Sequence, residues 1–174
     1  SSLYSVIRKA RIEKPANEVW KVLGQDFENA HLWMALVPNS HSKDYGAKVN
    51  EAPVCGRVCE FTDKPNGFYA DELITEYSDE KMEMTVEVTP QNAPSILPML
   101  KNTLKLKVNV INNYSSEVVW ESEPKLKPIG NLMYPFVKMG LGKAFSEVLE
   151  ELKYFVETGK PHPRKVKKTK LAVA

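Results

Sequence analysis

The chain has 174 residues, of which 43% are hydrophobic and 26% charged, with a formal net charge of +2. This composition is typical of a globular domain and excludes a fibrous or low-complexity protein. Residues 160–174 carry six Lys or Arg and no acid, so residues 1–159 have a net charge of −4. A mildly acidic body lacks the basic surface that neutralises phosphates, so we expect no nucleic-acid partner. We predict a single domain at 1–159 and a basic, disordered tail at 160–174.

The predicted elements begin with a strand at 4–12 and a short helix that starts near Pro15. A second short helix is predicted at 27–37, where Phe27, Ala30 and Met34 recur at helical spacing. Alternating apolar and charged residues, separated by turn residues, then indicate six antiparallel strands with one apolar face. These strands are predicted at 44–50, 56–63, 68–77, 81–89, 103–111 and 115–123.

A long amphipathic helix is predicted at 131–158, with Asn131 as its N-cap and Gly159 as its stop signal. Pro135 falls in the first turn, where its missing N–H is not needed. A sheet with one apolar face and a helix with one apolar stripe bury both when the helix lies on the concave side of the sheet. The sequence therefore predicts an α+β fold.

Several stretches resemble a known superfamily: the opening IEKPANEVWKVLGQDFENAHLW, the strand GRVCEF, the segment DELITEYSDEKMEMTVEV, the strand SSEVVWES and the C-terminal helix. Together they look like the START/Bet v 1-like (SRPBCC) superfamily, and most like its polyketide cyclase/dehydrase and lipid-transport branch. The resemblance implies a helix-grip fold. In this fold a curved sheet of about seven strands wraps around the long helix, and the two enclose an apolar cavity. The glycine-rich loop of Bet v 1 and the gate and latch loops of plant abscisic acid receptors are not matched, which disfavours a hormone receptor.

Metal, cofactor and membrane sites are not expected. His31 and His41 are ten residues apart and belong to no paired ligand motif. Cys55 and Cys59 would lie about 13 Å apart along a strand, too far for a disulfide. GLGKA lacks the first glycine and the Ser or Thr of a phosphate loop. No apolar run is long enough to cross a bilayer, so we expect no integral membrane association and a cytoplasmic protein.

Acid–base chemistry would need a carboxylate or histidine facing an apolar cavity, where its pKa would shift towards neutrality. The weak candidates for such a catalytic group are Glu72, Asp71, Glu60 and His31. For each of them a solvent-facing role is the favoured interpretation. The strand at 68–77 has hydrophobic residues on both faces, so alternation does not decide whether Asp71 or Glu72 points inward.

The connection at 89–102 is longer than a hairpin needs and contains Ile96 and Leu97 among three prolines. It is predicted either as a lid at a cavity mouth or as a loop packed on the core of the protein.

The leading functional hypothesis is the binding or transport of a hydrophobic small molecule, such as a lipid or polyketide-like compound, in an internal cavity. A cyclase, aromatase or dehydratase-type enzyme is the first alternative, and a protein-interaction module is the second. The predicted lining residues are Trp33, Met84, Leu97, Trp120, Phe136, Met139 and Leu141.

Overall fold

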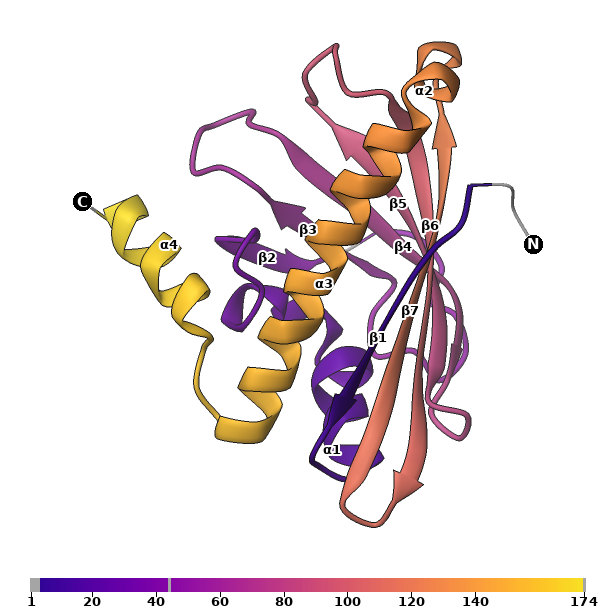
Figure 1. Cartoon of the computed structure of the whole chain (residues 1–174), viewed down its shortest axis with the longest axis vertical. Helices are drawn as coiled ribbons and strands as arrows, with labels where there is room; N and C mark the ends of the chain where they lie inside the picture. Colours follow the sequence, from indigo (N-terminus) through magenta and orange to yellow (C-terminus); the bar gives the residue numbers. More distant parts are fainter. Residues whose placement is uncertain (1–3, 44, 174) are drawn as a thin grey trace.

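The computed structural model describes residues 4–43 and 45–173 (Figure 1). Its centre is an antiparallel sheet of seven strands in the order β1-β7-β6-β5-β4-β3-β2. The predicted α+β helix-grip architecture is confirmed. The strands are β1 (Val6–Ile12), β2 (Asn39–Ser42), β3 (Gly56–Glu60), β4 (Tyr69–Ser78), β5 (Glu83–Gln91), β6 (Met99–Asn112) and β7 (Ser115–Leu126).

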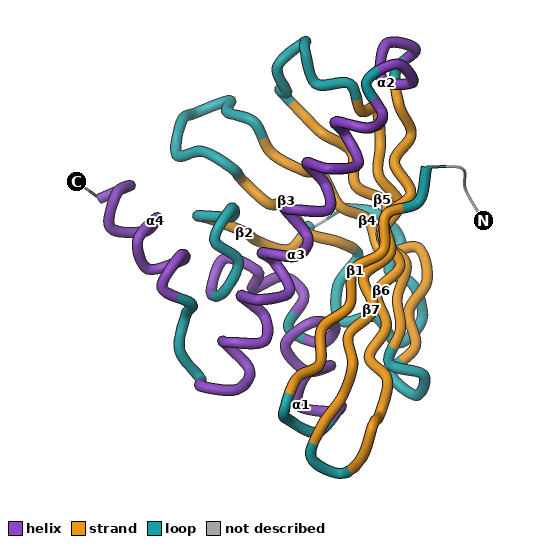
Figure 2. Tube along the Cα trace, viewed as in Figure 1, coloured by secondary structure: helices purple, strands orange, loops and turns teal. Residues whose placement is uncertain are grey.

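The helices gather on one face of this curved sheet, with the long helix α3 running across it (Figure 2). Gly159 ends α3 in the left-handed conformation, with φ of 72°, and Pro135 lies in its first turn, both as predicted. The helical segments are α1 (Ala16–Trp20), η1 (Lys21–Gln25, a π-helix), η2 (Phe27–Leu32, a 3-10 helix), α2 (Pro128–Leu132), α3 (Tyr134–Thr158) and α4 (Pro163–Val173).

Strand pairing places apolar side chains from neighbouring strands side by side on the inner face of the sheet. Tyr77 pairs with Met84, Met84 with Leu106, and Leu106 with Trp120. All four residues are buried. Because residues directly opposite each other share a face, this row forms a floor on which Tyr77 packs against Trp20 of α1 and Trp120 packs against Phe145 of α3.

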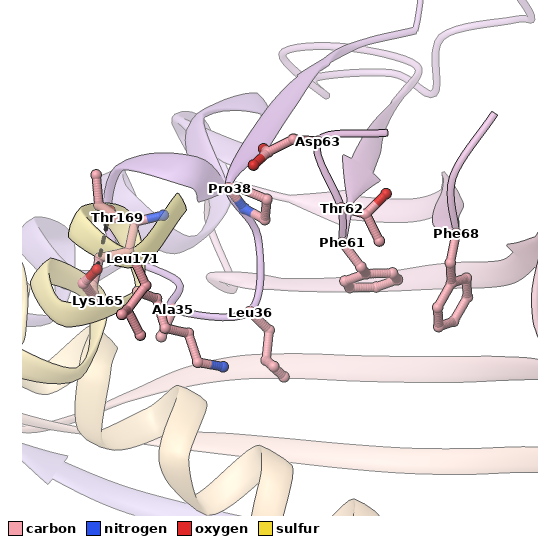
Figure 3. Close-up of a pocket in the computed structure, with 11 residues that line it drawn as sticks. Ala35, Leu36, Pro38, Phe61, Thr62, Asp63, Phe68, Lys165, Thr169 and Leu171 are labelled. Atoms are coloured by element: carbon pink, nitrogen blue, oxygen red, sulfur yellow. Dashed lines mark hydrogen bonds between the residues drawn. The ribbon is translucent and has the colours of Figure 1, made fainter. Parts of the chain in front are cut away.

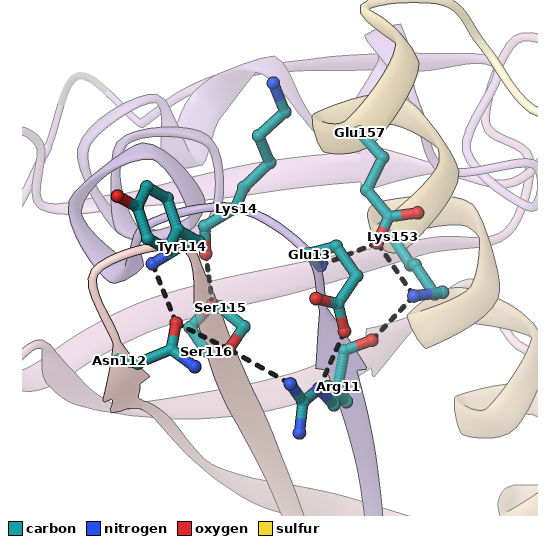
Figure 4. Close-up of polar contacts among 9 residues, drawn as sticks. All are labelled: Arg11, Glu13, Lys14, Asn112, Tyr114, Ser115, Ser116, Lys153 and Glu157. Atoms are coloured by element: carbon teal, nitrogen blue, oxygen red, sulfur yellow. Dashed lines mark hydrogen bonds and ion pairs between the residues drawn. The ribbon is translucent and has the colours of Figure 1, made fainter.

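Polar contacts fix the C-terminal end of α3 to the start of the chain (Figure 4). Lys153 donates to the Arg11 carbonyl oxygen at 2.8 Å, and the Glu13 amide donates to the Glu157 carboxylate at 2.7 Å. Lys153 and Glu157 also form an ion pair at 2.7 Å. At the start of β7, Ser116 Oγ donates to the Lys14 carbonyl oxygen at 3.1 Å. The end of the helix is therefore held both by its apolar face and by its polar rim.

The second short helix, predicted at 27–37, is a 3-10 helix that already ends at Leu32. Three further predicted elements differ from the structure. The strand expected at 44–50 is absent from 45–50, and β2 lies earlier, at Asn39–Ser42; residue 44 lies outside the described residues. The segment 45–50 includes Gly46 with φ of 104°, which does not suit a strand. The helix expected to start at Asn131 is split at Met133, whose φ is −90° and ψ 3°, into α2 and α3.

The third difference is the C-terminal segment, which was expected to be disordered and instead forms helix α4 (Figure 1). The His162 imidazole accepts a hydrogen bond from the Arg164 amide at 2.9 Å, and Pro163 is the first helical residue. A helix of 11 residues is marginal by itself in water, so its contacts with the domain stabilise it. None of the described helices is long and apolar enough to span a membrane.

Candidate binding site

A pocket of about 500 Å³ lies between α4, the segment that joins η2 to β2, and the β3–β4 hairpin (Figure 3). Phe61 and Phe68 provide aromatic rings on the hairpin side, 4.7 Å apart between centroids. Leu36 lies between these rings and α4 (Figure 3). A pocket of this size with mostly apolar walls suits a small organic molecule. Its walls are formed by Ala35, Leu36, Pro38, Phe61, Thr62, Asp63, Phe68, Lys165, Lys168, Thr169 and Leu171.

Helix α4 is held in place by two basic residues in its first turn. Lys165 is 7% exposed, and its Nζ donates to the Val37 carbonyl oxygen at 2.9 Å. Arg164 forms ion pairs with Glu151 at 2.7 Å and with Glu150 at 2.9 Å. These contacts join α4 both to α3 and to the segment between η2 and β2, so they position one wall of the pocket.

Glu151 connects three elements. It is 2% exposed, accepts a hydrogen bond from the Ala35 amide at 2.9 Å and pairs with Arg164 of α4. A buried carboxylate is tolerated because charged or amide donors satisfy it. Glu151 thereby fixes the loop residue Ala35, which lines the pocket, relative to α3.

Two titratable groups beside the pocket have shifted pKa values. Burial lowers the pKa of His31, and the positive charge of Lys165 lowers it further. Burial also lowers the pKa of Lys165, although the Glu151 carboxylate opposes this shift. Both effects disfavour positive charge at the junction of η2 and α4.

The predicted lining residues occupy different depths. Trp33, Met84 and Trp120 are buried at 2–3% exposure, whereas Leu97 and Leu141 are half-buried. Phe136 and Met139 are 68% and 67% exposed. By helical spacing these two lie on the opposite side of α3 from Leu141, so they lie outside the layer between helix and sheet.

Trp120 stands out in that layer because its polar atom has no partner. The indole packs beside Phe145 of α3, with ring centroids 5.6 Å apart. Its Nε1 is buried, and none of the described residues accepts its hydrogen bond. Most buried donors in proteins are paired, so this unpaired N–H is an exception among the described residues.

The predicted acids divide between the two faces of the sheet. Glu72 points inward, is 5% exposed and accepts from Arg57 Nε at 3.0 Å. Arg57 in turn donates to the Phe27 carbonyl oxygen at 2.8 Å and lies 3.8 Å above the Phe27 ring. Asp71 lies on the other face, where Lys43 Nζ approaches it to 2.5 Å. The inward acid is therefore already engaged by a buried cation.

The remaining candidates have local partners. Glu60 accepts a hydrogen bond from the Asn39 side chain at 2.9 Å near the surface. His31 Nδ1 lies 2.9 Å from Ser40 Oγ, and the His31 amide donates to the same oxygen at 3.0 Å. Ser40 Oγ also donates to the Glu28 carbonyl oxygen at 2.7 Å. These contacts tie η2 to β2.

Cys59 is 1% exposed and lies close to Arg57 and Glu72. Burial raises the pKa of its thiol far above the usual range, and the Glu72 carboxylate adds to this effect while Arg57 opposes it. The thiol is therefore neutral and poorly nucleophilic at neutral pH. Together with Arg57 and Glu72 it forms a satisfied polar cluster beneath η2.

None of the predicted site residues lines the pocket. Ala35 and Leu36 of the pocket wall lie within the segment 27–37 that was predicted as the second short helix, beyond the end of η2. Phe61 and Phe68 flank the β3–β4 turn, a position at which a sequence pattern does not distinguish pocket walls from core. The lysines of α4 were missed because their segment was expected to be disordered.

Comparison with known structures identifies the fold. A START superfamily protein from Mycobacterium smegmatis superimposes with a TM-score of 0.70 at 13% identity, over 90% of this chain and 99% of that chain. The chain has the START/Bet v 1-like helix-grip fold. Norcoclaurine synthase from Thalictrum flavum, solved in complex with dopamine and hydroxybenzaldehyde, gives a TM-score of 0.61 at 14% identity, over 91% of this chain and 88% of that chain.

DynU16, a protein in the dynemicin biosynthetic locus, also superimposes on this chain. Its TM-score is 0.61 at 13% identity, over 91% of this chain and 49% of that chain. A scan against protein-family models and a search of curated protein sequences find no match.

Proposed function

We propose that the protein binds and carries a hydrophobic small molecule, and that the pocket between α4 and the β3–β4 hairpin is part of its binding site. The observation that carries this proposal is the pocket itself, about 500 Å³ in volume and walled largely by apolar side chains. START/Bet v 1-like neighbours such as norcoclaurine synthase, solved with two small aromatic molecules, support the same reading at the level of fold. Burial of apolar ligand surface would supply the affinity.

The ligand is proposed to have one polar or acidic end. Lys165 and Lys168 lie on the α4 wall, while Phe61 and Phe68 lie on the hairpin wall. Asp63 also lies on the hairpin side, so the positive charge is concentrated at α4 (Figure 3). A molecule with an apolar body against the rings and an acidic group against Lys168 would satisfy both walls.

The pocket is tested with the neutral fluorescent probe N-phenyl-1-naphthylamine. Leu36→Asp places a charge in the apolar wall, and since Leu36 is 42% exposed the fold should tolerate it. We expect the substitution to weaken probe binding by about fivefold or more. The control is Tyr114→Asp, at a residue that is 78% exposed in the β6–β7 turn, and it should leave binding unchanged. Equal affinities for all three proteins would refute the assignment.

The polar end is tested by comparing oleate with methyl oleate in displacement of the same probe. Lys168→Glu should weaken the binding of oleate and leave the binding of methyl oleate unchanged, because only the free acid carries a charge. Lys81→Glu, at an exposed lysine of the β4–β5 turn, is the matched control. If Lys168→Glu weakened both ligands equally or neither, the ligand would be recognised by its apolar surface alone.

A further inference from the structure

An exposed apolar surface lies outside the binding pocket, on α2 and the first turns of α3. It consists of Ile129, Leu132, Phe136 and Met139, which are 55%, 81%, 68% and 67% exposed. We call these four residues the α2–α3 stripe. Phe136 and Met139 follow helical spacing on the outer side of α3, away from the sheet. Large side chains exposed together in this way mark a surface that contacts another apolar phase.

The chain around the α2–α3 stripe is basic. Residues 124–146 contain four lysines and no acid. Of these lysines, Lys125, Lys138 and Lys143 are exposed. The nearest acids along the chain are Glu123, which pairs with Lys105 at 3.5 Å, and Glu147. The stripe is therefore bordered by unopposed positive charge in its own segment.

The neighbouring β5–β6 loop extends this surface. The Lys127 amide, just before α2, donates to the Pro98 carbonyl oxygen at 2.8 Å, which fixes the loop beside α2. The loop presents Ile96, which is 80% exposed. Residues 88–102 contain one lysine and no acid. Figure 1 shows α2 at one end of the molecule and the β6–β7 turn at the other.

We propose that the α2–α3 stripe docks on an anionic lipid surface. Exposed Leu, Phe and Met side chains can enter the boundary between headgroups and acyl chains, while the flanking lysines contact acidic headgroups. A second copy of the chain is a poorer occupant. A twofold interface would place this surface against itself, and its lysines would face lysines across the contact.

The proposal is tested by co-sedimentation of the full chain with lipid vesicles, without added ligand. Vesicles of phosphatidylcholine with 30% phosphatidylserine should bind at least about tenfold more tightly than phosphatidylcholine alone, and salt should weaken the binding. Lys138→Glu combined with Lys143→Glu should remove most of this difference. Binding that is absent, or equal for both lipid compositions, would overturn the proposal.

The apolar contribution is tested by Leu132→Ser combined with Phe136→Ser. Because both side chains are exposed, the thermal midpoint should stay within about 2 °C of the wild type, while vesicle binding falls about tenfold or more. Tyr114→Ser, at an exposed aromatic residue of the opposite end, is the matched control and should bind as the wild type does. If the double variant bound vesicles as the wild type does, the α2–α3 stripe would not be the surface that contacts the lipid.

Sedimentation velocity, which resolves a 19.7 kDa monomer from its dimer, separates lipid docking from self-association. The wild type should be monomeric at concentrations at which it binds vesicles. A dimer that dissociates in the Leu132→Ser, Phe136→Ser variant would assign the stripe to a second copy instead. The N-phenyl-1-naphthylamine titration reports only on the pocket, so failure of vesicle binding and failure of the proposed ligand binding are distinguishable.

Discussion

The two halves of α3 have opposite environments. In the C-terminal half, Val148, Leu149 and Leu152 are buried at 0–4% exposure, and the polar contacts of Lys153 and Glu157 fix the helix to β1 (Figure 4). In residues 134–146 only Gly142 is buried. One helix thus anchors the fold at its C-terminal end and presents an apolar surface at its N-terminal end.

The largest expected effect is a difference in stability between substitutions in the two halves of α3. Leu152→Ala removes a side chain that is fully buried, so the free energy of unfolding should fall by about 2–5 kcal/mol. Met139→Ala removes one from the N-terminal half of α3 that is 67% exposed, and should change this free energy by less than about 0.5 kcal/mol. Urea unfolding followed by circular dichroism measures both values. Similar losses for the two variants would mean that the halves are packed alike.

The next effect concerns the attachment of α4 to the anchored half. Glu151→Ala leaves the buried Ala35 amide without its acceptor and should cost about 1–3 kcal/mol of unfolding free energy. Glu150→Ala, which removes a more exposed partner of the same arginine, should cost less than about 1 kcal/mol. Hydrogen exchange of residues 163–173 should accelerate in the first variant and remain near wild type in the second. The reverse order would contradict the role of Glu151.

A smaller effect probes the free half of α3. A methyl group at Gly140 would meet open space, so Gly140→Ala should raise the unfolding free energy by about 0.5–1 kcal/mol through helix propensity. At Gly142 the added Cβ would meet the Arg8 guanidinium, which must move aside. Gly142→Ala should therefore raise the unfolding free energy by less than Gly140→Ala does. Thermal unfolding of the two variants decides this, and an equal gain would show that Arg8 does not occupy that space.

The smallest effect is a pH dependence at the junction of η2 and α4. Burial, followed by the charge of Lys165, lowers the folded-state pKa of His31 below its ordinary value of 6.5. Below about pH 6.5 the unfolded chain therefore binds more protons, and stability falls as the pH decreases from 6.5 towards the folded-state pKa. In His31→Asn this loss between pH 7.5 and 5.5 should be reduced. A variant with the full loss would place the titration elsewhere.

Much of the fold could be predicted because local patterns and tertiary packing agree. Alternating apolar and charged residues indicated antiparallel strands with one apolar face, and strand pairing places Met84, Leu106 and Trp120 in one row on that face. Gly159 and Pro135 marked the ends of α3 through backbone rules that hold in any context. The direction of Glu72 was not predictable, because a register shift between Ile74 and Glu76 breaks the alternation of β4.

The pocket could not be predicted, because its walls come from three segments that approach only in the folded chain. Leu36, Phe61 and Phe68 are ordinary apolar residues at element ends, and nothing local separates them from core. Helix α4 is held by the ion pair of Arg164 with Glu151, and no local pattern distinguishes Glu151 from the solvent-facing acids of α3. The predicted Phe136 and Met139 are exposed because they lie on the side of α3 opposite Leu141, away from the sheet.

Photoaffinity labelling with a neutral, apolar diazirine probe tests the proposed binding of an apolar molecule most directly. After irradiation, peptide mapping locates the covalent adducts. Adducts are expected on the pocket walls, in residues 35–38, 61–68 and 165–171, and Leu36→Asp should reduce them. Labelling that is absent, or confined to the α2–α3 stripe and unaffected by Leu36→Asp, would contradict a ligand site in the pocket.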